Sequence, residues 1–330
     1  MGLVKGVNQT NKKDGYTPID LLKVKTYPIK DRKNKVKIED FAKVCSQDSS
    51  FKYFINSLPK VLAGNDFRNI VKSIASAYKE SKPVIFAMGG HVIKCGLGPI
   101  IIDLMKRGIL TAIAMNGSGS IHDFEIALIG ETSEDVADSI EDGSFGMAEE
   151  TGRLMNEAIK KGVKHGMGMG ESLGRKILEI DAPFKDLSVL ASAIKFDVPL
   201  TIHVAIGTDI IHQHGHADGA SIGEASFIDF RILTSCITDL GDGGVFINMG
   251  SAVLLPEVFL KALSVARNLG YPVFDFTTSD FDMIKHYRPS ENVVKRPTIK
   301  GGTGYSITGH HELMIPLLHR SILEELGDKT

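Results

Sequence analysis

The chain has 330 residues, of which 43% are hydrophobic and 24% are charged. This balance is typical of a globular protein and excludes a wholly disordered chain. The formal net charge of −2 gives no case for nucleic-acid binding, and no apolar run approaches the ~20 residues that a membrane-spanning helix needs. The three cysteines are far apart and fit a reducing compartment. We therefore expect a cytoplasmic protein that binds neither nucleic acid nor membrane.

Charge is distributed unevenly along the chain. Residues 1–50 carry 11 Lys+Arg against 6 Asp+Glu, a net of +5, so the remaining residues carry a net of −7. A basic arm can contact an acidic partner, a membrane or a nucleic acid, but a solvated extension beside an acidic body explains the same pattern. We expect residues 1–50 to be a basic N-terminal extension to a single domain at 51–330.

The first clear elements form a β-α-β unit. Residues 83–88 are a short apolar run typical of a buried strand, and residues 109–115 are a second. Between them, apolar residues recur at helical spacing over 97–105, Pro99 fits a first turn and Gly108 fits a C-terminal stop. Such a crossover implies a parallel sheet.

The alternation of helices and strands continues to the C-terminus. Helices are expected at 133–141, 145–161, 171–179, 186–195, 224–238, 256–268 and from 312 onward, and strands at 200–206, 245–248 and 272–276. The pattern predicts an α/β fold: a doubly wound, mainly parallel, Rossmann-like sheet with helices on both faces.

Glycine, hydroxyl and ionisable residues follow every predicted strand. In open parallel sheets, ligands bind outside the carboxyl ends of the strands. The segments at those ends are Gly89–Lys94, Asn116–Asp123, Gly207–Gly219, Met249–Ala252 and Thr277–Asp282. Five such turns at one edge indicate a ligand crevice. The residues that we expect to line one cavity there are Asn116, Gly117, Ser118, His122, Asp123, Gly250, Asp280 and Glu291.

One of two glycine-containing turns is a candidate phosphate site. The segment Asn116–Gly119 lacks the G-x-G-x-x-G dinucleotide pattern. Gly250–Ala252, before a predicted helix, could present backbone N–H groups to a phosphate. Close packing of strand against helix explains the same small residues, and both interpretations stay open.

A histidine cluster is the candidate metal site. In an extended chain, His212, His214 and His216 would share a face and could converge on one metal ion. Asp209, Asp218 and Glu224 could add oxygen ligands. The glycines at 215 and 219 favour a turning polar loop instead, so a metal is possible but not the favoured interpretation. His203 lies in an apolar run and fits a core histidine.

Several segments at the strand ends together indicate a family. They are Met88–Gly96, Asn116–Glu125, Asp218–Glu224, Gly250–Ala252, Thr277–Glu291 and Ile315–Leu318. In order and spacing they resemble the deoxyhypusine synthase family, over about residues 80–325. The resemblance implies a Rossmann-like fold, NAD as cofactor, and a homotetramer with sites at subunit interfaces.

The resemblance also implies a reaction. The family uses NAD to oxidise spermidine, and it moves an aminobutyl group through an imine on a lysine to a lysine of a translation factor. A desolvated, neutral amine suits this chemistry. Here the position of the family's lysine falls on Pro297, and Lys295 lies two residues away. Lys295 is either a displaced nucleophile or a solvated lysine, and the adjacent Arg296 favours the second interpretation.

The substrate pocket departs from the family as well. His91 and His122 stand where the family has an asparagine-type residue and a glutamate. A carboxylate-lined pocket favours a polycation, whereas imidazoles with Lys94 would tolerate an anionic or neutral group.

Site residues follow from the strand ends and from the resemblance. The catalytic candidates are His91, His122, Asp123, Glu224 and Lys295. The cofactor-binding candidates are Asn116, Gly117, Ser118, Gly250, Ser251, Thr277 and Asp280. The substrate-binding candidates are Lys94, Asp209, Asp218, Asp282 and Glu291.

The sequence is consistent with three functions. The leading one is an NAD-dependent, deoxyhypusine synthase-like enzyme that acts on a polyamine or another amine-bearing small molecule, by aminoalkyl transfer or dehydrogenation. The second is a metal-dependent lyase or hydrolase that uses the histidine cluster, where zinc would activate water. The third is a non-catalytic nucleotide-binding protein, supported by the missing lysine.

Overall fold

The computed structural model describes residues 16–327, so residues 1–15 of the predicted extension and residues 328–330 lie outside the described part. The chain divides into two units between Glu39 and Asp40. In the first unit the described side chains are exposed, and short 3-10 turns occur at Leu21–Lys23 and Ile29–Asp31. Residues 40–50 belong to the second unit, so the division falls earlier than residue 50.

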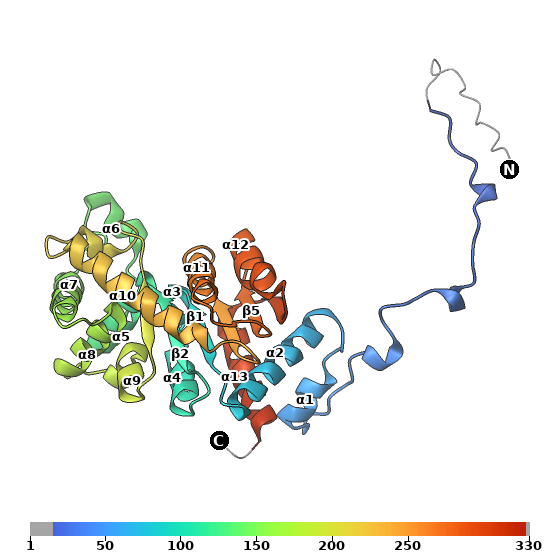
Figure 1. Cartoon of the computed structure of the whole chain (residues 1–330), viewed down its shortest axis with the longest axis horizontal. Coiled ribbons are helices and arrows are strands. Elements are labelled where there is room, and N and C mark those ends of the chain that lie inside the picture. The colour runs from blue at the N-terminus through green and yellow to red at the C-terminus, as the bar shows by residue number, and fades with distance from the viewer. Residues whose placement is uncertain (1–15, 328–330) are drawn as a thin grey trace. The chain divides into compact units, whose positions relative to one another are not determined.

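One six-stranded sheet forms the centre of the second unit (Figure 1). All neighbouring strands are parallel, in the order β3-β2-β1-β4-β5-β6. The strands are β1 (Val84–Met88), β2 (Ala112–Asn116), β3 (Leu200–His203), β4 (Val245–Met249), β5 (Thr277–Asp282) and β6 (Thr303–Thr308). The predicted doubly wound parallel sheet is confirmed.

Apolar side chains cover both faces of the sheet. Along β1, Val84, Phe86 and Met88 join one buried cluster, and Ile85 and Ala87 join another. Alternate residues of a strand point to opposite faces, so a strand buried on both sides is apolar throughout. Helices α2 (Leu62–Lys79), α4 (Gly98–Lys106) and α13 (His311–Leu326) contribute to the first cluster, and α10 (Gly219–Thr238) and α11 (Leu254–Asn268) to the second (Figure 1).

The remaining helices connect and flank these layers. They are α1 (Phe51–Ser57), α3 (Gly90–Lys94), α5 (Gly117–Ile129), α6 (Val136–Asp142), α7 (Glu149–Val163), α8 (Met169–Glu179), α9 (Val189–Lys195) and α12 (Tyr287–Pro289). The sequence does not predict α1, α2 or α5 as separate helices. None of the helices within residues 16–327 is both long and apolar enough to span a bilayer.

The fifth strand differs from the prediction. Residues 272–276 form a loop, and β5 begins at Thr277, which is in register with Val245 of β4. Val273 and Phe276 are buried in the core without belonging to a strand. The real strand carries Thr, Ser and Asp side chains that are buried although polar, so its composition does not identify it. The prediction of a strand at 272–276 is therefore wrong, and the strand is the segment that directly follows, Thr277–Asp282.

The strand order fixes where the fold can bind a ligand. In the order 3-2-1-4-5-6 the direction of strand addition reverses between β1 and β4, and ligands of such sheets bind at the carboxyl ends beside this point. The turns there are in contact, because the Gly89 N–H donates to the Met249 carbonyl oxygen at 3.0 Å. A Cβ on Gly89 would collide with the carbonyl oxygen of Gly250, so the close approach requires glycine.

Candidate functional site

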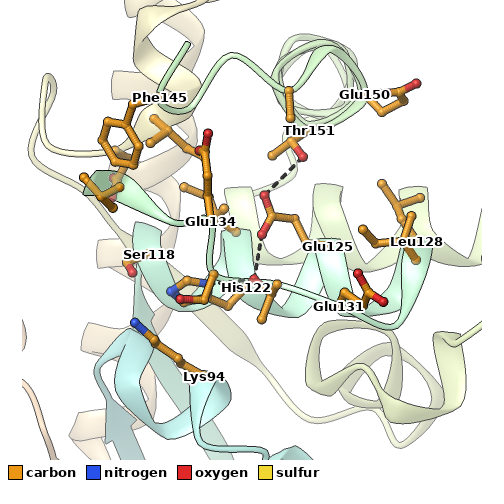
Figure 2. A pocket seen from close by; sticks show the side chains of 18 of the residues that line it. Lys94, Ser118, His122, Glu125, Leu128, Glu131, Glu134, Phe145, Glu150 and Thr151 are labelled. Atoms are coloured by element: carbon orange, nitrogen blue, oxygen red, sulfur yellow. Dashed lines mark hydrogen bonds between the residues drawn. The ribbon is translucent and has the colours of Figure 1, made fainter. Parts of the chain in front are cut away.

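A large cavity lies at the carboxyl ends of β1, β2 and β3. Its volume is about 920 Å³, within the range of small-molecule sites. Lys94 of α3 and Ser118 and His122 of α5 line it, and the segment from α6 to α7 closes the other side (Figure 2). The other residues that line it are Ile121, Glu125, Leu128, Ile129, Glu131, Thr132, Ser133, Glu134, Val136, Phe145, Ala148, Glu150, Thr151, Thr208, Asp209 and Ile210.

Carboxylates dominate the charge of this cavity. The acidic lining residues are Glu125, Glu131, Glu134, Glu150 and Asp209. Lys94 is the single Lys or Arg among the lining residues, and His122 is the single imidazole. The apolar side chains of Leu128, Val136 and Phe145 also line the cavity. The cavity therefore combines negative charge with apolar wall.

A chain of hydrogen bonds orients His122. The Thr132 hydroxyl donates to Glu125 Oε2 at 2.6 Å and lies 2.7 Å from His122 Nδ1. Since the hydroxyl proton goes to Glu125, Nδ1 carries a proton and donates it to Thr132 Oγ1. The Thr151 hydroxyl donates to the other oxygen of Glu125 at 3.2 Å. With Nδ1 as the donor, the Nε2 of a neutral His122 is an acceptor. Figure 2 shows the side chains of His122, Glu125 and Thr151.

The surroundings of His122 favour its neutral form. Burial lowers the pKa of this imidazole below its ordinary value, and the nearby charges of Lys94 and His91 lower it further. A neutral imidazole with a free Nε2 can accept a proton at neutral pH. His122 is therefore the best-placed proton acceptor of the cavity.

Asp209 brings a buried carboxyl group to the end of β3. It is 8% exposed, and burial raises its pKa to about 6. Its Oδ2 atom is buried without a hydrogen-bond partner, and a Cβ on Gly117 would collide with it. The glycine at the start of α5 is needed because the Asp209 carboxyl group lies against it.

A second polar cluster lies beneath the turns at the ends of β4 and β5. Asn248 donates to Asp280 Oδ1 at 2.8 Å and to the Ser251 carbonyl oxygen at 3.0 Å. Burial raises the pKa of Asp280 to about 6, and Asp282 adds to this effect. His311 is 1% exposed, with its Nε2 near Gly250 and no partner for its Nδ1.

The turns expected to hold NAD do not fit a pyrophosphate. At the start of α5, the Asp209 carboxyl group already faces the helix N-terminus, where a phosphate would bind. At the start of α11, Ser251 Oγ accepts the Leu255 N–H at 3.2 Å, and the Gly250 N–H donates to Phe281. Oxygen atoms of the protein thus fill both positions.

Three predicted site residues serve the backbone instead. Asp123 is buried and accepts hydrogen bonds from the Ser188 hydroxyl and from the N–H groups of Val189 and Leu190. It holds the start of α9 and does not line the cavity described above, so the structure gives Asp123 a structural role and no support for the predicted catalytic one. Asn116 and Asp218 are the N-caps of α5 and α10.

Four more predicted residues lie away from the cavity. Lys295 is exposed and pairs with Glu291 at 2.6 Å, which is the solvated arrangement favoured above. Glu224 is exposed on α10. Thr277 begins β5 and therefore lies at the amino edge of the sheet, because the strand starts there rather than ending before it. Its assignment to the cofactor site is wrong.

The structure also brings fewer of the predicted residues together in one cavity than expected. Of the eight residues proposed to line it, Ser118 and His122 do so. Gly250 and Asp280 belong to the second cluster at the same edge of the sheet, and Asp282 ends β5 beside them.

The three histidines of the candidate metal site do not all converge on one point, because His212 lies apart from the other two. His212 Nδ1 accepts the N–H groups of Gly207 and Asp209. His214 Nε2 lies 2.8 Å from the Gly146 carbonyl oxygen, and its Nδ1 abuts α7 at Gly152. The loop turns, as its glycines indicate, so the three imidazoles do not form one metal site, and His214 and His216 lie near Glu149 instead.

Several cavity residues were not predicted because they lie on the body of α5, on the α6–α7 segment or between them. Glu125 follows His122 by three residues, so both occupy one face of α5. This spacing could have identified Glu125. Nothing in the sequence alone places Thr132 or Thr151 beside it, because each reaches Glu125 through a loop or a separate helix.

Neither a family model nor a curated protein sequence matches the chain, but solved structures do. The chain is similar to a protein assigned as a deoxyhypusine synthase from Entamoeba histolytica (TM-score 0.48, 12% identity, 83% of this chain and 93% of that one). It is also similar to ArgZ, an arginine dihydrolase of cyanobacteria (TM-score 0.47, 14% identity, 80% and 33%). AgrE in complex with ornithine and NAD+ is similar at a TM-score of 0.48 (12% identity, 79% and 34%). The chain thus spans about a third of the length of ArgZ and AgrE.

Proposed function

We propose that the protein is an enzyme that binds an amine-bearing, cationic small molecule in the cavity over β1–β3, with His122 as proton acceptor. The observation that carries this proposal is the lining of the cavity, where five carboxylate side chains face a single lysine. A field of one sign in a concave site attracts ligands of the opposite charge. Anionic substrates are disfavoured there for the same reason.

The lining also fits the shape of a polyamine. Such a molecule alternates ammonium groups with methylene segments. The carboxylates of Glu131, Glu134 and Glu150 would pair with the ammonium groups. The side chains of Leu128 and Phe145 would contact the methylene segments. A polyamine is therefore the favoured substrate class, in agreement with the expectation from the family resemblance.

His122 would supply the chemistry that an amine needs. An ammonium group has no lone pair and must lose a proton before oxidation or transfer at the adjacent carbon. Neutral His122 can take that proton on Nε2, while Thr132 and Glu125 stabilise the imidazolium that forms. The resemblance implies NAD as hydride acceptor. The two helix N-termini do not fit its pyrophosphate, so we assign no step to it and treat its binding as an outcome of the test.

Calorimetric titration of the purified protein tests the proposal. Spermidine and diaminobutane are compared with butanediol and succinate, which have similar length but no charge or negative charge, each with and without NAD. We expect heat of binding for the two amines alone. Equal or tighter binding of succinate would contradict the proposal. Binding of NAD in these titrations would show that the turns at the starts of α5 and α11 rearrange. The family resemblance implies a homotetramer, and sedimentation of the same sample measures the oligomeric state.

A further inference from the structure

Three metal-ligating side chains meet outside the cavity described above. They are His91 of α3, Cys95 directly after α3 and Glu312 in the first turn of α13. One ligand atom from each lies within 4.8 Å of the other two. Bond lengths of about 2.0–2.3 Å to a shared ion would place such atoms about 3–4 Å apart, so small rotations of the side chains suffice.

The fold brings these residues together through two helices. His91 and Cys95 are four residues apart, which places them on one face of α3, and the Cys95 N–H donates to the His91 carbonyl oxygen at 3.0 Å. The start of α13 lies beside α3, because the rings of His311 and His91 are 5.8 Å apart. The fold therefore places the three residues beside one another.

A fourth polar atom lies near the cluster. His311 is buried, and its Nδ1 has no hydrogen-bond partner. His91 and Glu312 are exposed, which leaves a path for an ion to enter from solvent.

The structure contains one other candidate group in the described residues, Glu149 with His214 and His216. It is the weaker of the two, because one nitrogen of His214 lies 2.8 Å from a carbonyl oxygen and the other abuts α7. Neither nitrogen is free to bind an ion without a rearrangement.

We propose that His91, Cys95 and Glu312 form a binding site for a divalent zinc ion. A thiolate, an imidazole and a carboxylate are a set that Zn²⁺ accepts, and the thiolate disfavours Mg²⁺ and Ca²⁺. Three protein ligands leave a fourth position for water or for His311. The three ligands lie outside the lining of the cavity, so zinc binding can be tested without an amine.

Zinc titration of chelator-treated full-length protein tests the site. We expect one zinc ion per chain, and at least about tenfold weaker binding in Cys95→Ser and Glu312→Gln, since even indirect partners of a metal ligand cause such a loss. Cys45→Ser and His216→Asn are the matched controls and should bind zinc as the wild type does. Circular dichroism verifies that each variant is folded.

Cobalt supplies a second readout that does not depend on affinity. A thiolate-to-cobalt absorption band in the near ultraviolet should appear in the wild type and in Cys45→Ser, and it should be absent in Cys95→Ser. Undiminished zinc binding in Cys95→Ser, loss of binding in His216→Asn, or no zinc binding by the wild type would each overturn the proposal. None of these results depends on whether the cavity binds amines.

Discussion

The Asp209 carboxyl group lies directly against Gly117, and its Oδ2 points at the position where a side chain would begin. The two residues come from the ends of β3 and β2, which are neighbours in the sheet. Their contact places a buried acid in the lining of the cavity and against the first residue of α5. It thereby turns a possible phosphate site into part of an acidic pocket.

A methyl group at position 117 should disturb this contact. We expect Gly117→Ala to lower the free energy of unfolding by about 1–3 kcal/mol through overpacking, and to weaken amine binding because Asp209 must move. Gly219→Ala is the matched control, since Gly219 also directly follows the N-cap of its helix and a Cβ there meets open space. Chemical denaturation and calorimetry measure both effects. Equal free energies of unfolding for the two variants would contradict the close contact between Asp209 and Gly117.

The pKa of His122 should respond to Lys94. The lysine charge opposes protonation of the imidazole, so Lys94→Gln should raise the pKa of His122 toward its ordinary value. Burial is the larger cause of the low pKa and stays in place, so the rise is partial. Lys106→Gln, an exposed lysine on α4, is the control. An NMR titration of the ring protons decides, and a pKa unchanged by Lys94→Gln would show that the two groups are not coupled.

Asp229 should make stability depend on pH. It is buried, and its pKa is raised to about 7 by that burial, although it accepts the N–H groups of Gly170 and Ile202. The folded state holds this proton more tightly than the unfolded state, so the free energy of unfolding falls as pH rises from about 4 to about 7.

Asp209 and Asp280 contribute in the same direction. Asp229→Asn should therefore flatten the decline of the melting temperature over this range. The exposed Asp239→Asn should leave it unchanged. Melting curves at several pH values measure the difference, and parallel curves for the wild type and Asp229→Asn would refute the assignment.

Asp123 should prove structural. Asp123→Ala removes the acceptor of three buried hydrogen bonds at the start of α9 and should cost at least about 1–3 kcal/mol of stability. Amine affinity at a temperature where the variant is folded should stay within about twofold of the wild type, because the side chain does not line the cavity. Asp138→Asn, exposed on α6, controls for loss of charge. A large loss of affinity with intact stability would restore the catalytic assignment.

The sequence predicts the strands that are apolar and misses those that are polar. Residues 84–88 and 245–249 are buried on both faces, so composition alone identifies them. β5 and β6 are rich in Thr, Ser, Gly and Asp, and their pairing with β4 and with each other, rather than their composition, makes them strands. Long-range pairing of this kind is not visible in a local window.

The same limit applies to the site. His122 and Lys94 follow strands and are predicted from that position, whereas Thr132 and Thr151 reach the cavity by tertiary contacts. The acids at the strand ends cannot be sorted from sequence, since Asp123 faces a helix end and Asp209 faces the cavity. The direction of each side chain depends on tertiary packing, which the spacing of residues in the sequence does not determine.

The central claim is that the carboxylates of the cavity bind a cationic amine. It is tested most directly by calorimetric titration of spermidine into the wild type and into the double variant Glu131→Gln/Glu150→Gln, with Glu141→Gln on α6 as the control outside the cavity. We expect at least about tenfold weaker binding in the double variant, since each charge-assisted pair contributes on the order of 1 kcal/mol, and no change in the control. Equal affinity in all three proteins, or no binding by the wild type, would contradict the claim.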